Sequence, residues 1–226
     1  QPTILSTLRL PAAGEDLYVL DDDHAILLAN SLLIDGKGGS ELINVELGGP
    51  EALITSRFVL PGSYKDSRMV GDYLYVVSQA QRIVQEDGVN VFRPNYFLST
   101  WDMSDPGQPS LLAEIEKEGS VTVVNATGEH ILVGTVHPGS FGTHLTIFGL
   151  DAQNGLPFEI AAVELEGAVR DKFKLQLRDN VLTGISQVRR IVNLRNRRIT
   201  KLETFAIEEK AQTVTLLGEL ELADNE

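Results

Sequence analysis

Five arginines gather within residues 187–198 of a chain that is otherwise acidic: Arg189, Arg190, Arg195, Arg197 and Arg198. The guanidinium group is a planar fork of N–H donors that suits carboxylates and phosphates. The segment could therefore dock an acidic protein or a sulfated or uronic polysaccharide. The alternative is a solvated hairpin that pairs with the protein's own acidic outer strands, because charge runs are usually solvated faces. Both interpretations stay open at this point.

A second candidate is the long connection over residues 79–96, which carries Phe92, Arg93 and Tyr96. Long connections between strands often carry binding residues. These three side chains could form a contact patch for a peptide or a glycan. The competing interpretation is that the loop packs on its own part of the sheet.

Other motifs that could do chemistry are incomplete. His137 and His144 flank a short loop, but a zinc site needs three or four ligands, and no third ligand has a diagnostic spacing. The acidic run 21–23 lacks the pattern of a calcium loop and is interpreted as a turn, and the glycine-rich run 36–40 lacks the full phosphate-loop pattern. No catalytic residue, metal or cofactor is therefore expected.

Composition excludes several classes of function. The 226 residues include 32 acidic and 19 basic side chains, for a formal net charge of -13, which repels nucleic acid and anionic lipid at long range. The chain has no cysteine, so disulfides, thiol catalysis and thiolate metal sites are excluded.

No apolar run reaches the roughly 20 residues that span a bilayer. The first four residues do not resemble a signal peptide, so we expect that any signal peptide is removed or never existed.

A degenerate internal repeat underlies these segments. Glycines that follow an apolar strand recur at Gly14, Gly62, Gly119 and Gly167, and periods of roughly 40 to 50 residues are typical of propeller blades. Each unit has a second half in which a strand leads through a polar turn to another strand. The sequence predicts an all-β, propeller-type fold of about four four-stranded antiparallel blades. We expect one domain over residues 1–226, with approximate units 1–62, 63–119, 120–167 and 168–226.

The outermost strands show a regular alternation. In residues 114–116, 164–166 and 219–221 two glutamates flank an aliphatic residue. Neighbouring side chains of a strand point to opposite faces, so we expect the carboxylates to face outward and Ile115, Leu165 and Leu220 to face inward. Charged outer strands also discourage pairing between molecules.

Two stretches resemble a known family. Residues 67–78 (SRMVGDYLYVVS) and 98–109 (LSTWDMSDPGQP) are similar to the secreted bacterial and archaeal β-propeller family that is distantly related to WD repeats. The resemblance is strongest in the second unit, and the Ser-Asp-Pro turn is missing from the first and fourth. It implies an extracytoplasmic propeller (secreted, periplasmic or cell-surface) without enzymatic activity, usually in a longer chain.

The expected strand count has a consequence for the ring. A leading strand near Ile4–Leu10 followed by four complete units is one strand too many for a closed four-bladed ring. This predicts an open arc or a fragment of a larger ring, completed by absent sequence or by a second copy.

Three functions remain open. The preferred hypothesis is a non-catalytic module that binds or scaffolds a protein or glycan. The alternatives are a polysaccharide-acting propeller enzyme, a hydrolase or lyase with its site at a ring face, and a purely structural segment.

Overall fold

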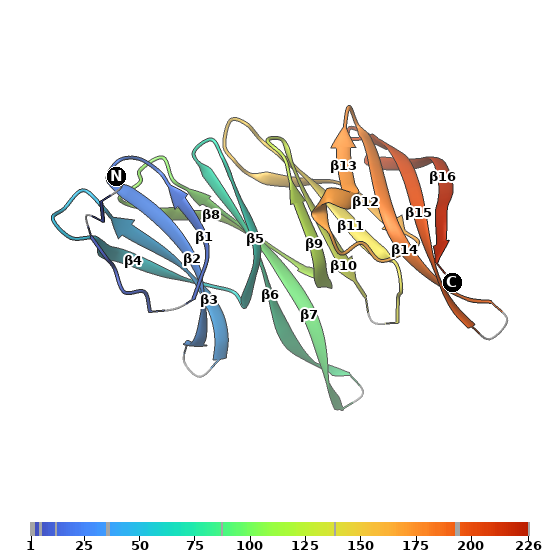
Figure 1. Cartoon of the computed structure of the whole chain (residues 1–226), viewed down its shortest axis with the longest axis horizontal. Helices are drawn as coiled ribbons and strands as arrows, with labels where there is room; N and C mark the ends of the chain where they lie inside the picture. Colours follow the sequence, from blue (N-terminus) through green and yellow to red (C-terminus); the bar gives the residue numbers. More distant parts are fainter. Residues whose placement is uncertain are drawn as a thin grey trace. The chain divides into compact units, whose positions relative to one another are not determined.

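The protein folds into four antiparallel sheets and almost no helix (Figure 1). The structure is a computed structural model, and it describes residues 3–4, 6–11, 13–34, 37–86, 88–137, 139–192 and 195–225. In each sheet, neighbouring strands follow one another along the chain, which is the arrangement of a propeller blade. The predicted fold class is confirmed. The chain divides into two compact units, Gln1–Glu118 and Gly119–Glu226.

The first unit contains two blades that pack face to face. Apolar side chains from both blades form one buried cluster, in which Leu28 and Leu42 of blade 1 meet Leu74 and Trp101 of blade 2. Blade 1 consists of β1 (Ala13–Val19), β2 (His24–Ile34), β3 (Lys37–Glu46) and β4 (Leu53–Leu60). Blade 2 consists of β5 (Ser63–Val70), β6 (Tyr73–Glu86), β7 (Val89–Asp102) and β8 (Ser110–Glu118).

The second unit repeats this plan. Its buried cluster joins Leu132 and Ile147 of blade 3 to Leu182 and Phe205 of blade 4. Blade 3 consists of β9 (Ser120–Ala126), β10 (His130–Val136), β11 (Thr143–Leu150) and β12 (Pro157–Leu165). Blade 4 consists of β13 (Leu175–Arg178), β14 (Val181–Val192), β15 (Arg195–Glu208) and β16 (Thr213–Asn225), and it is preceded by the 3-10 turn η1 (Lys172–Lys174). Each blade lies within one of the four repeats predicted from the sequence. That these four repeats form a single domain stays a prediction.

The expected leading strand is wrong. The described part of the segment Ile4–Leu10 forms no strand; instead Leu8 packs on an apolar cluster of blade 1, and the Ala52 amide donates to Ser6 Oγ at 3.0 Å. The described strands fill four blades of four, so the extra strand from which the open arc is inferred is absent among them; the open arc or ring fragment itself stays a prediction.

The alternation of the outermost strands is present in two of the three places. Ile115 is half-buried and Leu165 is buried, and each lies between exposed glutamates. Leu220, however, is 57% exposed. It lies in register with Leu202, which lies in register with Ile185, so this row faces away from the cluster that blade 4 shares with blade 3.

A hydrogen-bonded tyrosine cluster links the first strands of blades 1 and 2. The Tyr64 hydroxyl donates to the Asp16 carboxylate, and Ser67 Oγ lies 2.8 Å from the Tyr18 hydroxyl and 2.9 Å from that of Tyr64. Ser67 also donates to Asp16 Oδ2 at 3.1 Å. Burial raises the pKa of both phenols, and the bond to Asp16 raises the pKa of Tyr64 further. The folded protein therefore favours the neutral phenols.

This cluster predicts a loss of stability at alkaline pH. Because the phenol pKa values are higher in the folded than in the unfolded chain, their contribution is complete below the unfolded value of about 10 and is lost as pH rises above it. We expect Tyr64→Phe to cost about 1 kcal/mol at neutral pH and to make the alkaline loss shallower. Urea unfolding at several pH values measures both effects. Tyr73→Phe, which removes a phenol outside the cluster, is the control; an unchanged alkaline slope in Tyr64→Phe contradicts the assignment.

Gly62 provides a second prediction. It has φ +79°, and a Cβ at this position would lie 2.1 Å from the Gln79 carbonyl oxygen. Gly71 also has a positive φ, but its Cβ would meet nothing within 4 Å. We expect Gly71→Ala to cost about 1 kcal/mol and Gly62→Ala about 2–4 kcal/mol, because the clash adds to the backbone cost. Chemical denaturation compares the two variants, and equal costs would show that the contact with Gln79 is unimportant.

Candidate functional site

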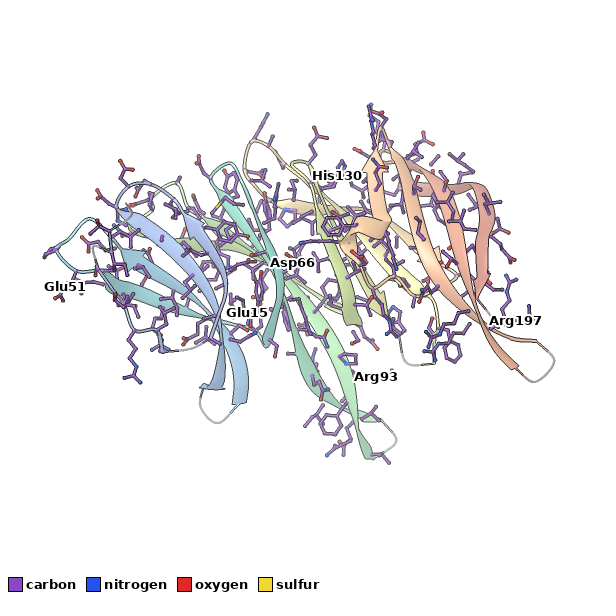
Figure 2. All side chains as sticks on the ribbon, viewed as in Figure 1. Glu15, Glu51, Asp66, Arg93, His130 and Arg197 are labelled. Atoms are coloured by element: carbon purple, nitrogen blue, oxygen red, sulfur yellow. The ribbon has the colours of Figure 1, made fainter. Side chains whose placement is uncertain are left out.

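The arginine-rich segment is a β-hairpin. Strands β14 and β15 stay paired as far as Val192 and Arg195, and Figure 2 labels Arg197 on this hairpin. The pairing sets like charges opposite each other, because Arg189 lies in register with Arg198 and Arg190 with Arg197. Like charges that face each other across a ladder are destabilising, so each pair favours a nearby anion. The side chain of Arg195 lies outside the described residues.

Arg190 finds its anions within the protein. Its guanidinium donates to Glu166 at 3.2 Å and to Glu221 at 2.6 Å. Both glutamates belong to the acidic outer edge of the blades: Glu166 directly follows β12, and Glu221 lies in β16. For this arginine the structure agrees with the interpretation of a hairpin that pairs with the protein's own acidic strands.

A buried lysine extends this ion-pair network. Lys201 has a side chain that is 7% exposed, and its Nζ lies 2.6 Å from both Glu166 and Glu219 and 3.8 Å from Glu203. Hydrogen bonds to Glu166 and Glu219 raise the pKa of Lys201, whereas hydrogen bonds from Lys201 and Arg190 lower the pKa of Glu166. Glu203 is also buried and accepts a hydrogen bond from Ser186 Oγ at 3.1 Å. The network keeps buried charges paired and therefore has a structural role.

Arg189 lies in a different environment. It lines a pocket of about 160 Å³, which we call the arginine pocket, formed by Thr122, Val136, Ser140, Phe141, Ala168, Arg170, Gln187 and Arg189. In the part of the chain that the structure describes, neither Arg189 nor Arg170 forms an ion pair, and both side chains are exposed. Two cations without an ion pair in one pocket of an acidic protein make it a candidate site for an anion.

Two backbone hydrogen bonds bring these arginines into the same pocket. The Ala168 amide donates to the Gln187 carbonyl at 2.9 Å, and the Gln187 amide donates back at 3.0 Å. The buried Thr143 hydroxyl holds the same segment, because it donates to the Gly167 carbonyl at 3.1 Å and accepts from the Val169 amide at 2.8 Å. The segment that precedes Arg170 is thus tied to β14, the strand of Arg189.

The predicted contact patch at Phe92, Arg93 and Tyr96 lies on a hairpin and not in a loop. Strands β6 and β7 pair along their whole length, and Figure 2 labels Arg93 on this hairpin. Phe92 is 62% exposed and lies in register with Ile83, and Arg93 pairs with Glu118 at 3.5 Å. Tyr96 is only 1% exposed, so its inclusion in an exposed patch is wrong. Its position places it in the buried part of β7, where blade 2 is four strands wide.

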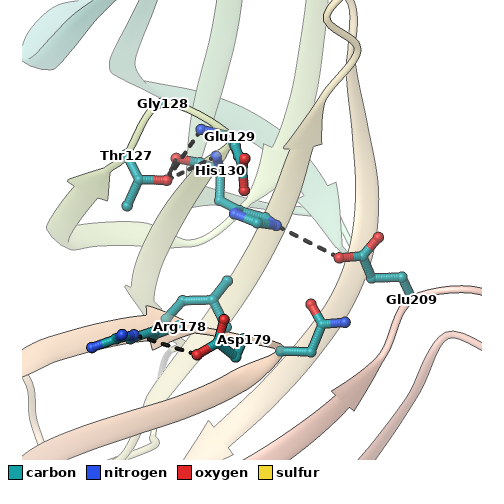
Figure 3. Close-up of a pocket in the computed structure, with 9 residues that line it drawn as sticks. Thr127, Gly128, Glu129, His130, Arg178, Asp179 and Glu209 are labelled. Carbon is teal, nitrogen blue, oxygen red and sulfur yellow. Dashed lines mark hydrogen bonds and ion pairs between the residues drawn. The ribbon is translucent and has the colours of Figure 1, made fainter.

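A larger cleft opens at the turns of blades 3 and 4 (Figure 3). It has a volume of about 460 Å³ and lies between the β9–β10, β13–β14 and β15–β16 turns. Asp179 and Asn180 both have positive φ values, as expected for a two-residue hairpin turn. His130 Nε2 lies 3.7 Å from Glu209 Oε1, the only imidazole–carboxylate pair among the residues that line the cleft. The Thr127 hydroxyl accepts from the amides of Glu129 and His130, so it is not poised as a nucleophile.

The other candidate motifs have local explanations. The imidazoles of His137 and His144 pack edge to face, with ring centroids 5.2 Å apart, and His144 Nδ1 lies 2.5 Å from Glu164. Asp21 forms a turn, as predicted, by accepting hydrogen bonds from the amides of Asp23 and His24. Among the described residues, no three His, Asp or Glu side chains form a group that could hold a metal ion. None of the described helices is long and apolar enough to cross a membrane.

Of the residues that line the arginine pocket, sequence reasoning singled out only Arg189 as a binding residue, and it missed Arg170 and Phe141 among others. Arg170 is a single arginine in a connection, and Phe141 is a single aromatic residue in a loop. Neither has a strong local signal, because the pocket arises from segments that are distant in sequence. One weak signal was available: Phe141 is a large aromatic residue inside a short loop rich in glycine and serine, where apolar residues are unusual.

Comparisons with known proteins give the following similarities. No protein-family model and no curated protein matches the chain. Among solved structures, the chain is similar to a protein described as a putative 6-phosphogluconolactonase from Bacteroides fragilis, at 12% identity and a TM-score of 0.23, over 90% of this chain and 83% of the other. It is also similar to dipeptidyl peptidase 4 from Porphyromonas gingivalis, at 10% identity and a TM-score of 0.28, over 93% of this chain and 46% of that one.

The lysine network leads to a stability prediction. We expect Lys201→Met to cost about 3 kcal/mol, because Glu203 would stay buried without a cation. Adding Glu203→Gln should restore part of this loss. Lys210→Met, at an exposed turn lysine, is the control and should change stability by less than about 0.5 kcal/mol. Urea denaturation measures all three variants; wild-type stability in Lys201→Met would contradict a structural role for the network.

Proposed function

We propose that this protein is a non-catalytic β-propeller module that acts outside the cytoplasm and binds or scaffolds a protein or glycan with acidic groups. The arginine pocket is the binding site. The observation that carries this proposal is the pair Arg170 and Arg189, which share one pocket and have no ion-pair partner among the described residues. The extracytoplasmic location rests on the resemblance of residues 67–78 and 98–109 to secreted propellers.

The charge of the chain explains why an acidic ligand would be bound only by direct contacts inside the arginine pocket. The net charge of -13 repels a polyanion at long range. At physiological ionic strength the Debye length is about 8 Å, so this repulsion is screened while direct contacts inside the pocket persist. Guanidinium groups bind carboxylates and sulfates through paired hydrogen bonds. The site therefore favours short or branched acidic groups that reach the pocket over a long polyanion that lies along the surface.

Three carboxyl groups have lowered pKa values, which bears on whether they could act as a general acid. A glycosidase needs a carboxylic acid with a raised pKa to protonate the leaving group. The carboxyl groups with a resolved shift in the described residues are Asp21, Asp102 and Glu166, and hydrogen bonds lower the pKa of each. These groups are held as anions, which is the wrong state for a general acid. None of these three carboxyl groups is therefore suited to be the general acid of a polysaccharide-acting enzyme.

A retention experiment tests the proposed site. The intact chain is passed over beads that carry short oligoglutamate or oligogalacturonate chains at physiological salt. We expect the double variant Arg170→Ser/Arg189→Ser to lose at least tenfold in affinity, because two charge-assisted contacts disappear. Arg178→Ser is the matched control, because Arg178 is an exposed arginine in the turn cleft and pairs with Asp179 at 3.3 Å. Equal retention of the double variant and the wild type would remove the arginine pocket from consideration.

A further inference from the structure

The size of the arginine pocket limits what can enter it. Its volume of about 160 Å³ is below the roughly 300–1,000 Å³ of sites that enclose a drug-sized ligand. One charged group and the ring that bears it can approach, while the rest of a larger ligand stays in solvent. A chain end or a single branch fits this limit.

Phe141 supplies an aromatic surface beside the two arginines. It is 75% exposed, and the loop that carries it is closed by hydrogen bonds within the loop. The Ser140 amide donates to the His137 carbonyl at 3.0 Å, and the Gly142 amide donates to Ser140 Oγ at 3.2 Å. A Cβ on Gly142 would lie 2.4 Å from the Leu165 carbonyl oxygen, so the loop lies directly against the end of β12. The ring lines the pocket and stays exposed, and it offers a large apolar face.

Polar side chains also line the arginine pocket. The Ser140 hydroxyl accepts from Gly142 and keeps its own proton to donate. The exposed Gln187 amide offers both a donor and an acceptor beside Arg189. Hydroxyl and amide groups of this kind bind sugar hydroxyls, which are themselves both donors and acceptors.

The two arginines, the ring of Phe141 and the polar groups of Ser140 and Gln187 together distinguish among acidic ligands. A glutamate side chain or an inorganic sulfate brings a charge but no ring beside it. A hexuronic acid brings a carboxylate, an adjacent face of ring C–H groups and several hydroxyls. Each part has a counterpart here: the carboxylate in Arg170 and Arg189, the C–H face in Phe141, and the hydroxyls in Ser140 and Gln187.

We propose that the arginine pocket binds a hexuronic acid residue at the end or on a branch of an acidic glycan, with the sugar ring stacked on Phe141. This inference rests on the proposed function and names its ligand class. Arg170 and Arg189 hold the carboxylate, and Phe141 selects the sugar over other anions.

Calorimetric titration of the full chain tests this assignment with three probes. These are trigalacturonate, its fully methyl-esterified form and inorganic sulfate. We expect trigalacturonate to bind and the neutral ester to bind at least tenfold more weakly, because it lacks the carboxylates. Phe141→Ala should weaken trigalacturonate about tenfold, as loss of a stacking contact does, and should leave the affinity for sulfate unchanged. Phe173→Ala is the matched control, because Phe173 is 88% exposed and lies outside the pocket.

The outcomes separate the two proposals. If Arg170→Ser/Arg189→Ser abolishes anion binding while Phe141→Ala has no effect, the acidic-ligand site stands and the hexuronate assignment is wrong. The same holds if sulfate binds and trigalacturonate does not. If the arginine variant binds all probes like the wild type, or if the wild type binds none, both proposals are wrong. Thermal unfolding of each variant by circular dichroism confirms that the comparison is made on folded protein.

Discussion

Face-to-face packing of twisted sheets is the constraint on which the rest of this structure depends. A single blade of four strands has two faces and cannot bury its apolar residues alone. In the second unit, Leu132 and Ile147 on one sheet meet Leu182 and Phe205 on the next. Burial of each such side chain contributes about 1.5–3 kcal/mol, and the middle strands carry most of it. The outer strands, the turns and the connections between blades are left free to differ.

Those free segments place the chemistry at the ends of the strands. The connection before Arg170 crosses from blade 3 to blade 4 and is tied to β14 by the paired hydrogen bonds of Ala168 and Gln187. The loop that carries Phe141 ends at β11 of blade 3. The arginine pocket exists because the packing of the two blades brings these segments to one place. The cleft at His130 arises in the same way from three turns, which come from both blades.

Charge is divided between two roles in this acidic chain. Lys201 and Arg190 are surrounded by Glu166, Glu219 and Glu221, and they make the glutamates of the outer edge compatible with a folded blade. Arg170 and Arg189 lie close to this network in sequence but take no part in it. Ion pairing therefore separates the structural cations Lys201 and Arg190, of which only Lys201 is buried, from the exposed arginines of the pocket.

The repeat unit, the strand alternation and the turns were determined by the sequence alone, because they depend on residues that are close together in the chain. Glycines such as Gly62 and the alternation around Ile115 and Leu165 mark blades without knowledge of any distant contact. Local patterns also misled at the segment Ile4–Leu10, which is apolar enough for a strand but has no strand partner among the described residues. They misled at Tyr96 as well, because an aromatic residue looks the same in an exposed patch and in a buried sheet.

Only the tertiary structure decided which residues form the candidate site. All five arginines of residues 187–198 are equivalent in sequence, yet Arg190 is neutralised by glutamates 24 and 31 residues away, whereas Arg189 meets Arg170 in a pocket. That difference follows from the register between β14 and β15 and from the contact of residue 168 with residue 187. Long-range contacts of this kind are set by the packing of whole blades, and no local pattern of residue types encodes them.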